Sequence, residues 1–252
     1  MSAQEFLVVD RLSRDFGGQR AVAEVSFTLP EGALTALIGP NGAGKTTLFN
    51  LVAGALPPTS GAVRFRGQPV LEAAQATRLG VARTFQNIRL FPGLSVLENV
   101  LAAMGGHSFW QGSFRLPRRL EEERLRLKRA HYLLEDLGLA HLGEQPARTI
   151  PFGQQRLLEI ARALALQPRL LLLDEPAAGL NRTETAALAE LIRRLHGRGL
   201  SLLLVEHDMH LVMHLASRVI VLEQGRIIAD GTPAEVQCDE RVRTAYLGPP
   251  AE

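Results

Sequence analysis

A glycine-rich run around one lysine carries the clearest chemical signal in this 252-residue chain. Residues 39–46 fit the pattern GxxxxGK followed by Ser or Thr at every position. Glycines let backbone N–H groups surround an anion without Cβ clashes, and the start of a helix adds partial positive charge. The run predicts a nucleotide phosphate site in which Lys45 reaches the β- and γ-phosphates and the Thr46 hydroxyl binds Mg²⁺. The residues expected to line it are Gly39, Pro40, Asn41, Gly42, Ala43, Gly44, Lys45, Thr46 and Thr47.

Two acidic residues follow a run of four leucines at 170–173. The leucines predict a buried strand, so Asp174 and Glu175 come at its carboxyl end, where ligands bind in open α/β sheets. Asp174 is expected to hold Mg²⁺, mostly through water, and Glu175 to take a proton from the attacking water. Two acids that merely cap a strand are the alternative, which the phosphate loop disfavours.

A histidine ends the next apolar strand pattern. His207 directly follows residues 202–206, and that strand end is expected to lie beside the one that carries Asp174. There His207 would hydrogen-bond the γ-phosphate and hold the geometry of the site. A lone histidine is more often a structural residue, so both interpretations stay open at this point.

These residues need a scaffold, and the hydrophobic pattern predicts one. Short strands come first, helices follow in the middle, and strands and helices alternate in the last third, which favours a mostly parallel α/β core interrupted by a helical lobe. The expected strands are 6–9, 25–29, 33–38, 62–65, 170–173, 202–205 and the hairpin 219–223 with 226–229; the expected helices are 47–53, 96–103, 120–137, 153–165, 182–198 and one from 209.

Composition excludes several classes of protein. Hydrophobic residues make up 46% and charged residues 21%, as in ordinary globular proteins rather than disordered or fibrous ones. The single Cys238 rules out an internal disulfide, and the net charge of +2 is too small to indicate nucleic acid as a partner. Apolar stretches are too short to span a membrane and residues 1–6 lack a signal segment, so a cytoplasmic protein is expected.

Together, the phosphate loop, residues 170–176 and His207 resemble the ATP-binding subunit of ABC transporters over nearly the whole chain. The resemblance implies a P-loop NTPase (RecA-like) core with an N-terminal antiparallel β subdomain in residues 1–90 and 166–252, and an inserted α-helical lobe in residues 91–165. It implies that Gln86 touches Mg²⁺ and the attacking water. It also implies that Phe16 stacks on adenine, although a core position for Phe16 is the alternative.

The stretch 150–155 is similar to the signature motif of this family, but it departs from the common LSGGQ. Pro151 replaces the serine and lacks both a hydroxyl and an N–H. Gly153, Gln154 and the start of the following helix remain to contact the ATP of a partner subunit. The implied site is functional but forms a weaker ATP sandwich. At position 181 the family more often has aspartate, whereas this chain has the uncharged Asn181. How the two ATP sites of a dimer would communicate therefore stays open.

Within the family, the chain looks most like the ATPases of branched-chain amino acid importers. The similar stretches are 83–87, 153–162, 174–181, 206–209, 243–248 and the loop around 109–119. The resemblance implies an ATP- and Mg²⁺-dependent motor on the inner face of the cell membrane. Its implied partners are two transmembrane permease subunits, a second ATP-binding subunit, identical or related, and indirectly a substrate-binding protein.

Other functions remain as alternatives. One alternative within transport is an importer with another cargo: urea, another amide or a lipid-type substrate. A soluble ABC ATPase acting on nucleic acid usually has two ATP domains or long coiled-coil insertions, and this chain has neither. A small-molecule kinase would leave the signature-like motif and His207 without roles.

Overall fold

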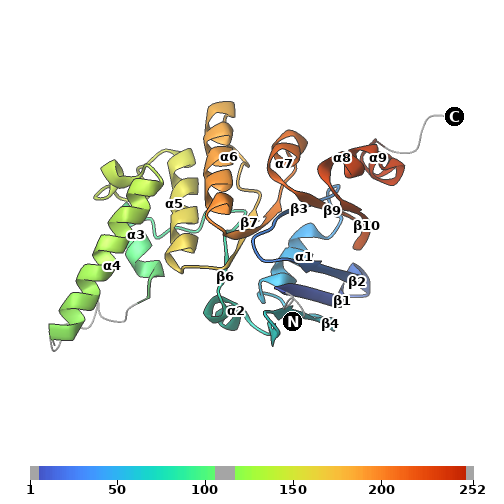
Figure 1. Ribbon diagram of the computed structural model, residues 1–252, viewed down its shortest axis with the longest axis horizontal. Helices are drawn as coiled ribbons and strands as arrows, with labels where there is room; N and C mark the ends of the chain where they lie inside the picture. Colours follow the sequence, from blue (N-terminus) through green and yellow to red (C-terminus); the bar gives the residue numbers. More distant parts are fainter. Residues whose placement is uncertain (1–5, 106–116, 248–252) are drawn as a thin grey trace.

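The computed structural model describes residues 6–105 and 117–247, which form two β-sheets and their covering helices (Figure 1). The first sheet is antiparallel, with the strand order β2-β1-β4-β5. Its strands are β1 (Leu7–Phe16), β2 (Gln19–Leu29), β4 (Ser60–Phe65) and β5 (Gln68–Pro69). β1 and β2 are longer than the predicted strands because bulges let them continue past polar residues that interrupt the alternation.

The second sheet is parallel except at one edge and has the order β10-β9-β3-β8-β7-β6. Its strands are β3 (Leu34–Ile38), β6 (Val81–Arg83), β7 (Leu170–Asp174), β8 (Ser201–Val205), β9 (Arg218–Glu223) and β10 (Arg226–Gly231). The turn between β9 and β10 has positive φ angles of 46° at Gln224 and 78° at Gly225, as a two-residue hairpin turn requires. The short edge strand β6 was not predicted.

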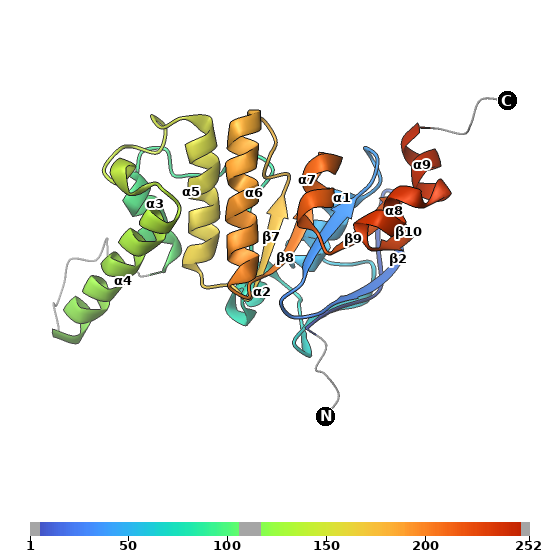
Figure 2. The ribbon, with the colours of Figure 1, turned by 45° about the horizontal axis from the view of Figure 1, so that its top comes forward.

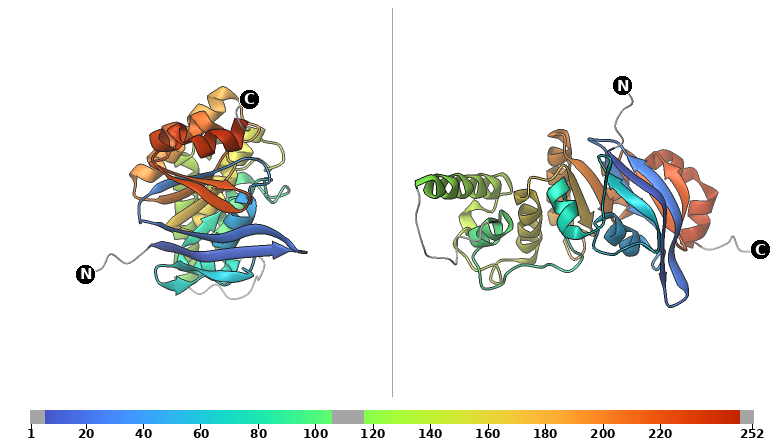
Figure 3. Two further views of the ribbon diagram at one scale, coloured as in Figure 1. Left: turned by 90° about the vertical axis from the view of Figure 1, so that its right-hand side faces the viewer. Right: turned by 90° about the horizontal axis from the view of Figure 1, so that it is seen from below.

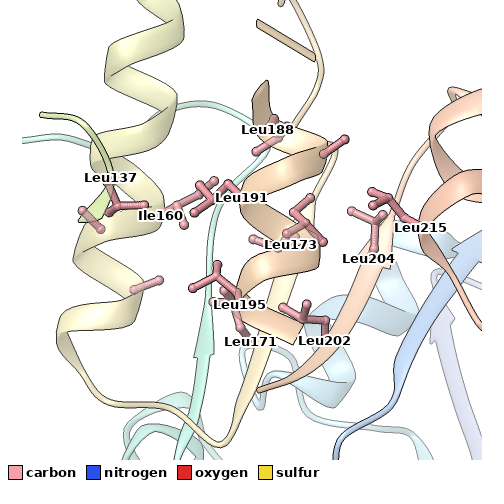
Figure 4. Close-up of a cluster of buried hydrophobic side chains, with 14 of the residues drawn as sticks. Leu137, Ile160, Leu171, Leu173, Leu188, Leu191, Leu195, Leu202, Leu204 and Leu215 are labelled. Carbon is pink, nitrogen blue, oxygen red and sulfur yellow. The ribbon is translucent and has the colours of Figure 1, made fainter. Parts of the chain in front are cut away.

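The parallel strands are buried on both faces, and side chains that alternate along them enter two separate cores. Leu171, Leu173, Leu202 and Leu204 pack with leucines of the helix α6 (Arg182–Gly197) on one face (Figure 4). The opposite face packs on α1 (Lys45–Val52), which lies between the two sheets (Figure 3). This double burial explains why the strands read as unbroken apolar runs.

Four helical segments between the strands gather at one end of the molecule (Figures 1 and 2). They are α3 (Val96–Ala103), α4 (Pro117–Asp136), the 3₁₀ turn η1 (Ala140–Leu142) and α5 (Phe152–Ala165). α5 packs beside α6 (Figure 4) and also contacts β6 and the segment that follows it, so this helical end joins the sheet at both places.

The remaining helices cover the edges of the core. They are α2 (Ala73–Leu79), α7 (Met209–Leu215), α8 (Pro233–Cys238) and α9 (Glu240–Leu247). α2, α8 and α9 were not predicted. Across residues 6–105 and 117–247, no helix has both the length and the apolar character needed to cross a membrane.

Candidate active site

Four neighbouring parallel strands end at one edge of the second sheet, and each delivers residues to the site. β3 leads into the phosphate loop, β8 leads to His207, β7 ends at Asp174, and β6 leads to Gln86. These strands lie in the order β3-β8-β7-β6. Asp174 pairs in register with Val205, which confirms that the strand end before His207 lies beside the one that carries Asp174.

The phosphate loop requires glycine at two positions because other parts of the backbone press against it. Gly39 has φ 150°, and a Cβ there would lie 2.0 Å from the carbonyl oxygen of Leu222. Gly44 has φ 98°, and a Cβ there would lie 2.2 Å from the carbonyl oxygen of Ala21. The loop is therefore clamped between β9 and β2, which fixes the direction in which its N–H groups point.

Lys45 folds over this loop. Its ammonium nitrogen donates to the carbonyl oxygens of Gly39 at 2.7 Å and Pro40 at 2.9 Å, which leaves one of its three donors for a phosphate. The residue is only 5% exposed, and burial lowers its pKa although Glu175 and Asp174 act in the opposite direction. The neighbouring Thr46 is exposed, so its hydroxyl is open to a ligand.

Asp174 provides a buried carboxylate whose Oδ1 accepts no hydrogen bond from any residue the structure describes. Its backbone N–H donates to the hydroxyl of Thr84 at 3.2 Å, which ties the end of β7 to the segment after β6. Burial and the carboxylate of Glu175 raise the pKa of Asp174. A buried acceptor without a donor is what a hydrated cation would satisfy, so the carboxylate fits Mg²⁺.

Glu175 is held at both carboxylate oxygens. Gln86 donates from Nε2 to one oxygen at 3.1 Å, and Nε2 of His207 lies 2.7 Å from the other. Since a carboxylate only accepts, this contact requires the proton of a neutral His207 ring to be on Nε2. Glu175 also has φ 46°, a conformation that non-glycine residues rarely adopt and that concentrates at functional sites. The three predicted catalytic side chains are thus brought together.

A further buried carboxylate, which the sequence did not single out, organises the loops beside this group. Glu206 accepts hydrogen bonds from the backbone N–H groups of Ala177 at 2.8 Å and His207 at 3.1 Å. It thereby joins the loop after β7 to the loop after β8. The only signal in the sequence was an acidic residue at the end of an apolar strand, which also fits an ordinary strand cap.

Two aromatic residues bear on the nucleotide site, Phe16 and Tyr246. Phe16 is 46% exposed beneath the guanidinium of Arg14, so it is a surface residue and not a core residue. Tyr246 lies near the end of α9, where burial raises the pKa of its hydroxyl and the backbone of Gly39 acts in the opposite direction. Sequence reasoning missed Tyr246 because α9 was not predicted.

The signature-like motif begins α5. Pro151 is the N-cap residue with φ −54° and ψ 152°, and no side chain caps this helix end. A Cβ on Gly153 would lie 2.4 Å from a carboxylate oxygen of Glu184 in α6, so the two helices begin side by side. Asn181 caps α6 through its Oδ1, which accepts from the N–H of Glu184 at 3.0 Å. The oxygen of Asn181 is therefore already used within the chain.

The start of α5 and the phosphate loop lie apart within one chain, with α6 and β7 between α5 and α1 (Figures 1 and 2). The structure therefore brings Gln86, Asp174, Glu175 and His207 together with the phosphate loop, but not with Pro151, Gly153 and Gln154. The predicted loop around 109–119 lies largely outside the described residues, as does Gly248 at the end of the 243–248 stretch.

Comparisons with known proteins agree with this geometry. Residues 22–178 match the family described as ABC transporter, and residues 226–248 match the family described as branched-chain amino acid ATP-binding cassette transporter. The high-affinity branched-chain amino acid transport ATP-binding protein BraF of Pseudomonas aeruginosa is 42% identical over 252 residues, which covers 98% of this chain and 99% of BraF.

Solved structures are similar over almost the same length. The ADP conformation of an ATP-binding cassette of an ABC transporter superimposes with a TM-score of 0.85 at 31% identity, covering 97% of this chain and 99% of the other. A dimeric, post-hydrolysis ATP-binding cassette bound to ADP and Pi gives a TM-score of 0.76 at 25% identity, covering 90% and 99%.

Proposed function

The chain belongs to the ATP-binding subunits of ABC transporters, in the branched-chain amino acid transport group, and we propose that its hydrolysis of ATP drives the uptake of leucine, isoleucine and valine. One observation carries the hydrolytic part of the proposal. Glu175 stands at the sheet edge next to the phosphate loop with both carboxylate oxygens held, by Gln86 and by His207. A carboxylate fixed in this way is suited to accept a proton from a water molecule.

Each part of the site then has one task. The clamped loop and Lys45 bind the phosphates, and Phe16 offers an exposed ring to the adenine. Glu175 takes the proton of the attacking water, and Gln86 orients that water. His207 holds Glu175 through its Nε2–H, and with ATP bound the same N–H turns to the γ-phosphate. Glu206 and Thr84 keep the surrounding loops in place. In the reaction, the water oxygen forms a bond to the γ-phosphorus, the bond from that phosphorus to the bridging oxygen breaks, and ADP and inorganic phosphate leave.

Mg²⁺ is the metal that fits these residues. Thr46 offers an exposed hydroxyl, Gln86 a side-chain oxygen, and Asp174 a buried carboxylate oxygen without a donor among the described residues. Hard oxygen ligands and retained waters suit Mg²⁺. When bound, the ion neutralises charge that develops on the phosphates.

A second subunit is needed to complete the site. Pro151, Gly153 and Gln154 lie away from the phosphate loop of their own chain, so they are placed to meet the nucleotide of a partner. The dimeric cassette with ADP and Pi supports such an arrangement. We place the subunit pair at the inner face of the membrane beneath two permease subunits, with residues 91–165 as the lobe that contacts them. Phe91, 47% exposed just after Gln86, belongs to the proposed contact surface.

The proposal is tested in native cells that carry either the parent chain, Glu175→Gln, or the control Glu190→Gln. Glu190 lies on the exposed side of α6 and pairs with Arg193. Glu190→Gln therefore removes one negative charge, as Glu175→Gln does, but at a place outside the site. We expect Glu175→Gln to lower phosphate release by the purified chain about 10²- to 10⁴-fold and to abolish uptake of labelled leucine but not of labelled urea.

Two results would contradict separate parts of the proposal. If phosphate release survives Glu175→Gln, Glu175 is not the base. If phosphate release is lost while leucine uptake continues and urea uptake stops, the chain is an ATPase for an amide and not for branched-chain amino acids. Glu190→Gln should behave as the parent in every arm.

A further inference from the structure

The backbone around Gln86 is bound by two buried, oppositely charged residues of α5. Arg156 donates to the carbonyl oxygens of Phe85 and Gln86, each at 3.0 Å. Glu159 accepts from the N–H groups of Phe85 at 3.2 Å and Arg89 at 3.4 Å. The two side chains also bind each other at 2.8 Å and are 2% and 4% exposed. Both backbone N–H groups and backbone carbonyl oxygens of residues 85–89 are therefore hydrogen-bonded to side chains of α5.

Further contacts of the same helix strengthen this anchor. Arg162 donates to the carbonyl oxygen of Arg89 and lies over the ring of Phe91 at 4.8 Å. The sequence positions 156, 159 and 162 recur every three residues, so all three side chains leave α5 on one side. α5 thus contacts the chain from 85 to 91.

Stability alone does not explain a buried ion pair at this place. Removing two charges from water is costly, and well-packed apolar residues of similar volume usually stabilise a protein as well or better. Here the hydrogen bonds that the pair makes, apart from the one between its two members, go to the backbone of one loop rather than to other parts of the helical end. The pair therefore provides a fixed position for that loop.

From these contacts we infer that Arg156 and Glu159 are positioning residues that fix Gln86 to the helix beginning at the signature-like motif, so that Gln86 reaches Glu175 only while α5 holds this loop. The inference rests on the proposed ATPase function. Arg156 lies one helical turn after Phe152, the first residue of α5. A displacement of the start of α5 by a partner's nucleotide is therefore carried directly to Gln86, which is 3.1 Å from Glu175.

The test uses the double variant Arg156→Gln/Glu159→Gln, which removes both charges of the pair together, so neither partner is left as an unpaired buried ion. The matched control is Ile160→Val, a buried change on the same helix within the hydrophobic core. The single variant Arg156→Lys is a second probe, because it keeps the charge but cannot bind two carbonyls and a carboxylate with a planar fork. All are made in the full chain, with ATP and Mg²⁺ as the ligands.

We expect kcat of the double variant to fall about tenfold while KM for ATP stays within twofold, because the pair touches no residue of the phosphate loop. Amide hydrogen exchange in residues 85–89 should become at least tenfold faster, whereas exchange in α6 stays as in Ile160→Val. Arg156→Lys should change both quantities in the same direction and by less. Faster exchange in residues 85–89 alone indicates that the loop is no longer held in place, whereas faster exchange in α6 as well would indicate a general loss of stability.

The inference is overturned if exchange in residues 85–89 and kcat of the double variant both stay within twofold of Ile160→Val. Failure of the proposed function gives a different result, since the parent chain would then release no phosphate above the level of Glu175→Gln. In that case the exchange measurement still decides whether the pair fixes the loop.

Discussion

Replacing Pro151 by serine tests how a departure from the family's usual signature affects the ATP sandwich. Pro151 is an N-cap residue without a capping side chain, and its ψ of 152° is in the extended range that serine adopts at this position. The serine oxygen would accept from an N–H of the first turn of α5, and its O–H would be free to donate to the γ-phosphate of a partner's ATP. We therefore expect Pro151→Ser to tighten ATP-dependent dimerisation.

The magnitude follows from the two interactions. A capping serine contributes about 1 kcal/mol of stability, and loss of proline costs about 0.4–1 kcal/mol through the unfolded chain. The stability of the single subunit should thus change little. A hydrogen bond to a charged group contributes about 1.5–3 kcal/mol, which corresponds to roughly tenfold to a hundredfold tighter dimerisation for each ATP in the interface.

The assay is sedimentation of the chain with ATP and Mg²⁺ over a range of protein concentrations, in the Glu175→Gln background, where we expect slow hydrolysis. Pro151→Ala is the control, because it removes the proline ring without adding a hydroxyl. If serine and alanine give the same dimerisation constant, the hydroxyl makes no contact with the nucleotide and the reasoning is wrong.

Two further predictions concern stability. Gly44→Ala should lower the free energy of unfolding by at least about 2 kcal/mol, since its Cβ meets the carbonyl oxygen of Ala21. Gly42→Ala, with φ 81° and open space around its Cβ, should lower it by only about 1 kcal/mol. Equal losses for both variants in urea unfolding would show that the backbone around the loop yields to the added methyl group. Asp136→Asn should cost no more than about 1 kcal/mol at pH 7, because Arg198, at 2.6 and 2.8 Å, lowers the pKa of Asp136 below its ordinary 3.8. A lowered carboxyl pKa stabilises the folded chain above about pH 3.8, and that contribution disappears as the pH falls through the pKa of the folded state. If Asp136→Asn costs the same stability at pH 2 as at pH 7, the prediction is wrong.

The phosphate loop and the strand ends could be predicted because their signals are local. The glycines, the lysine and the apolar runs before Asp174 and His207 each indicate their structure within a few residues, and parallel strand ends meet at one edge of a sheet. The order in which the strands lie, with β8 between β3 and β7, is set by long-range pairing that no local pattern encodes.

Apart from Tyr246, the residues that sequence reasoning missed are buried charges. A helical Arg and Glu three residues apart, such as Arg156 and Glu159, have the pattern of a solvent-exposed pair. Only the tertiary structure shows that both are covered by the loop at Gln86. Asn181 is a different case, because it is exposed and caps α6, a position where asparagine and aspartate serve equally well.

The pairing of distant strands has a consequence for how the chain reaches its native state. Leu34 of β3 pairs with Leu202 of β8, so the phosphate loop and His207 become neighbours only after most of the chain has been synthesised and the central strands have joined. A partly folded chain therefore has no complete site, and nucleotide binds only the finished sheet. At a ligand concentration one hundred times Kd, such selective binding adds about 2.7 kcal/mol to the native state. Bound nucleotide would thus stabilise the fold as well as supply the reaction.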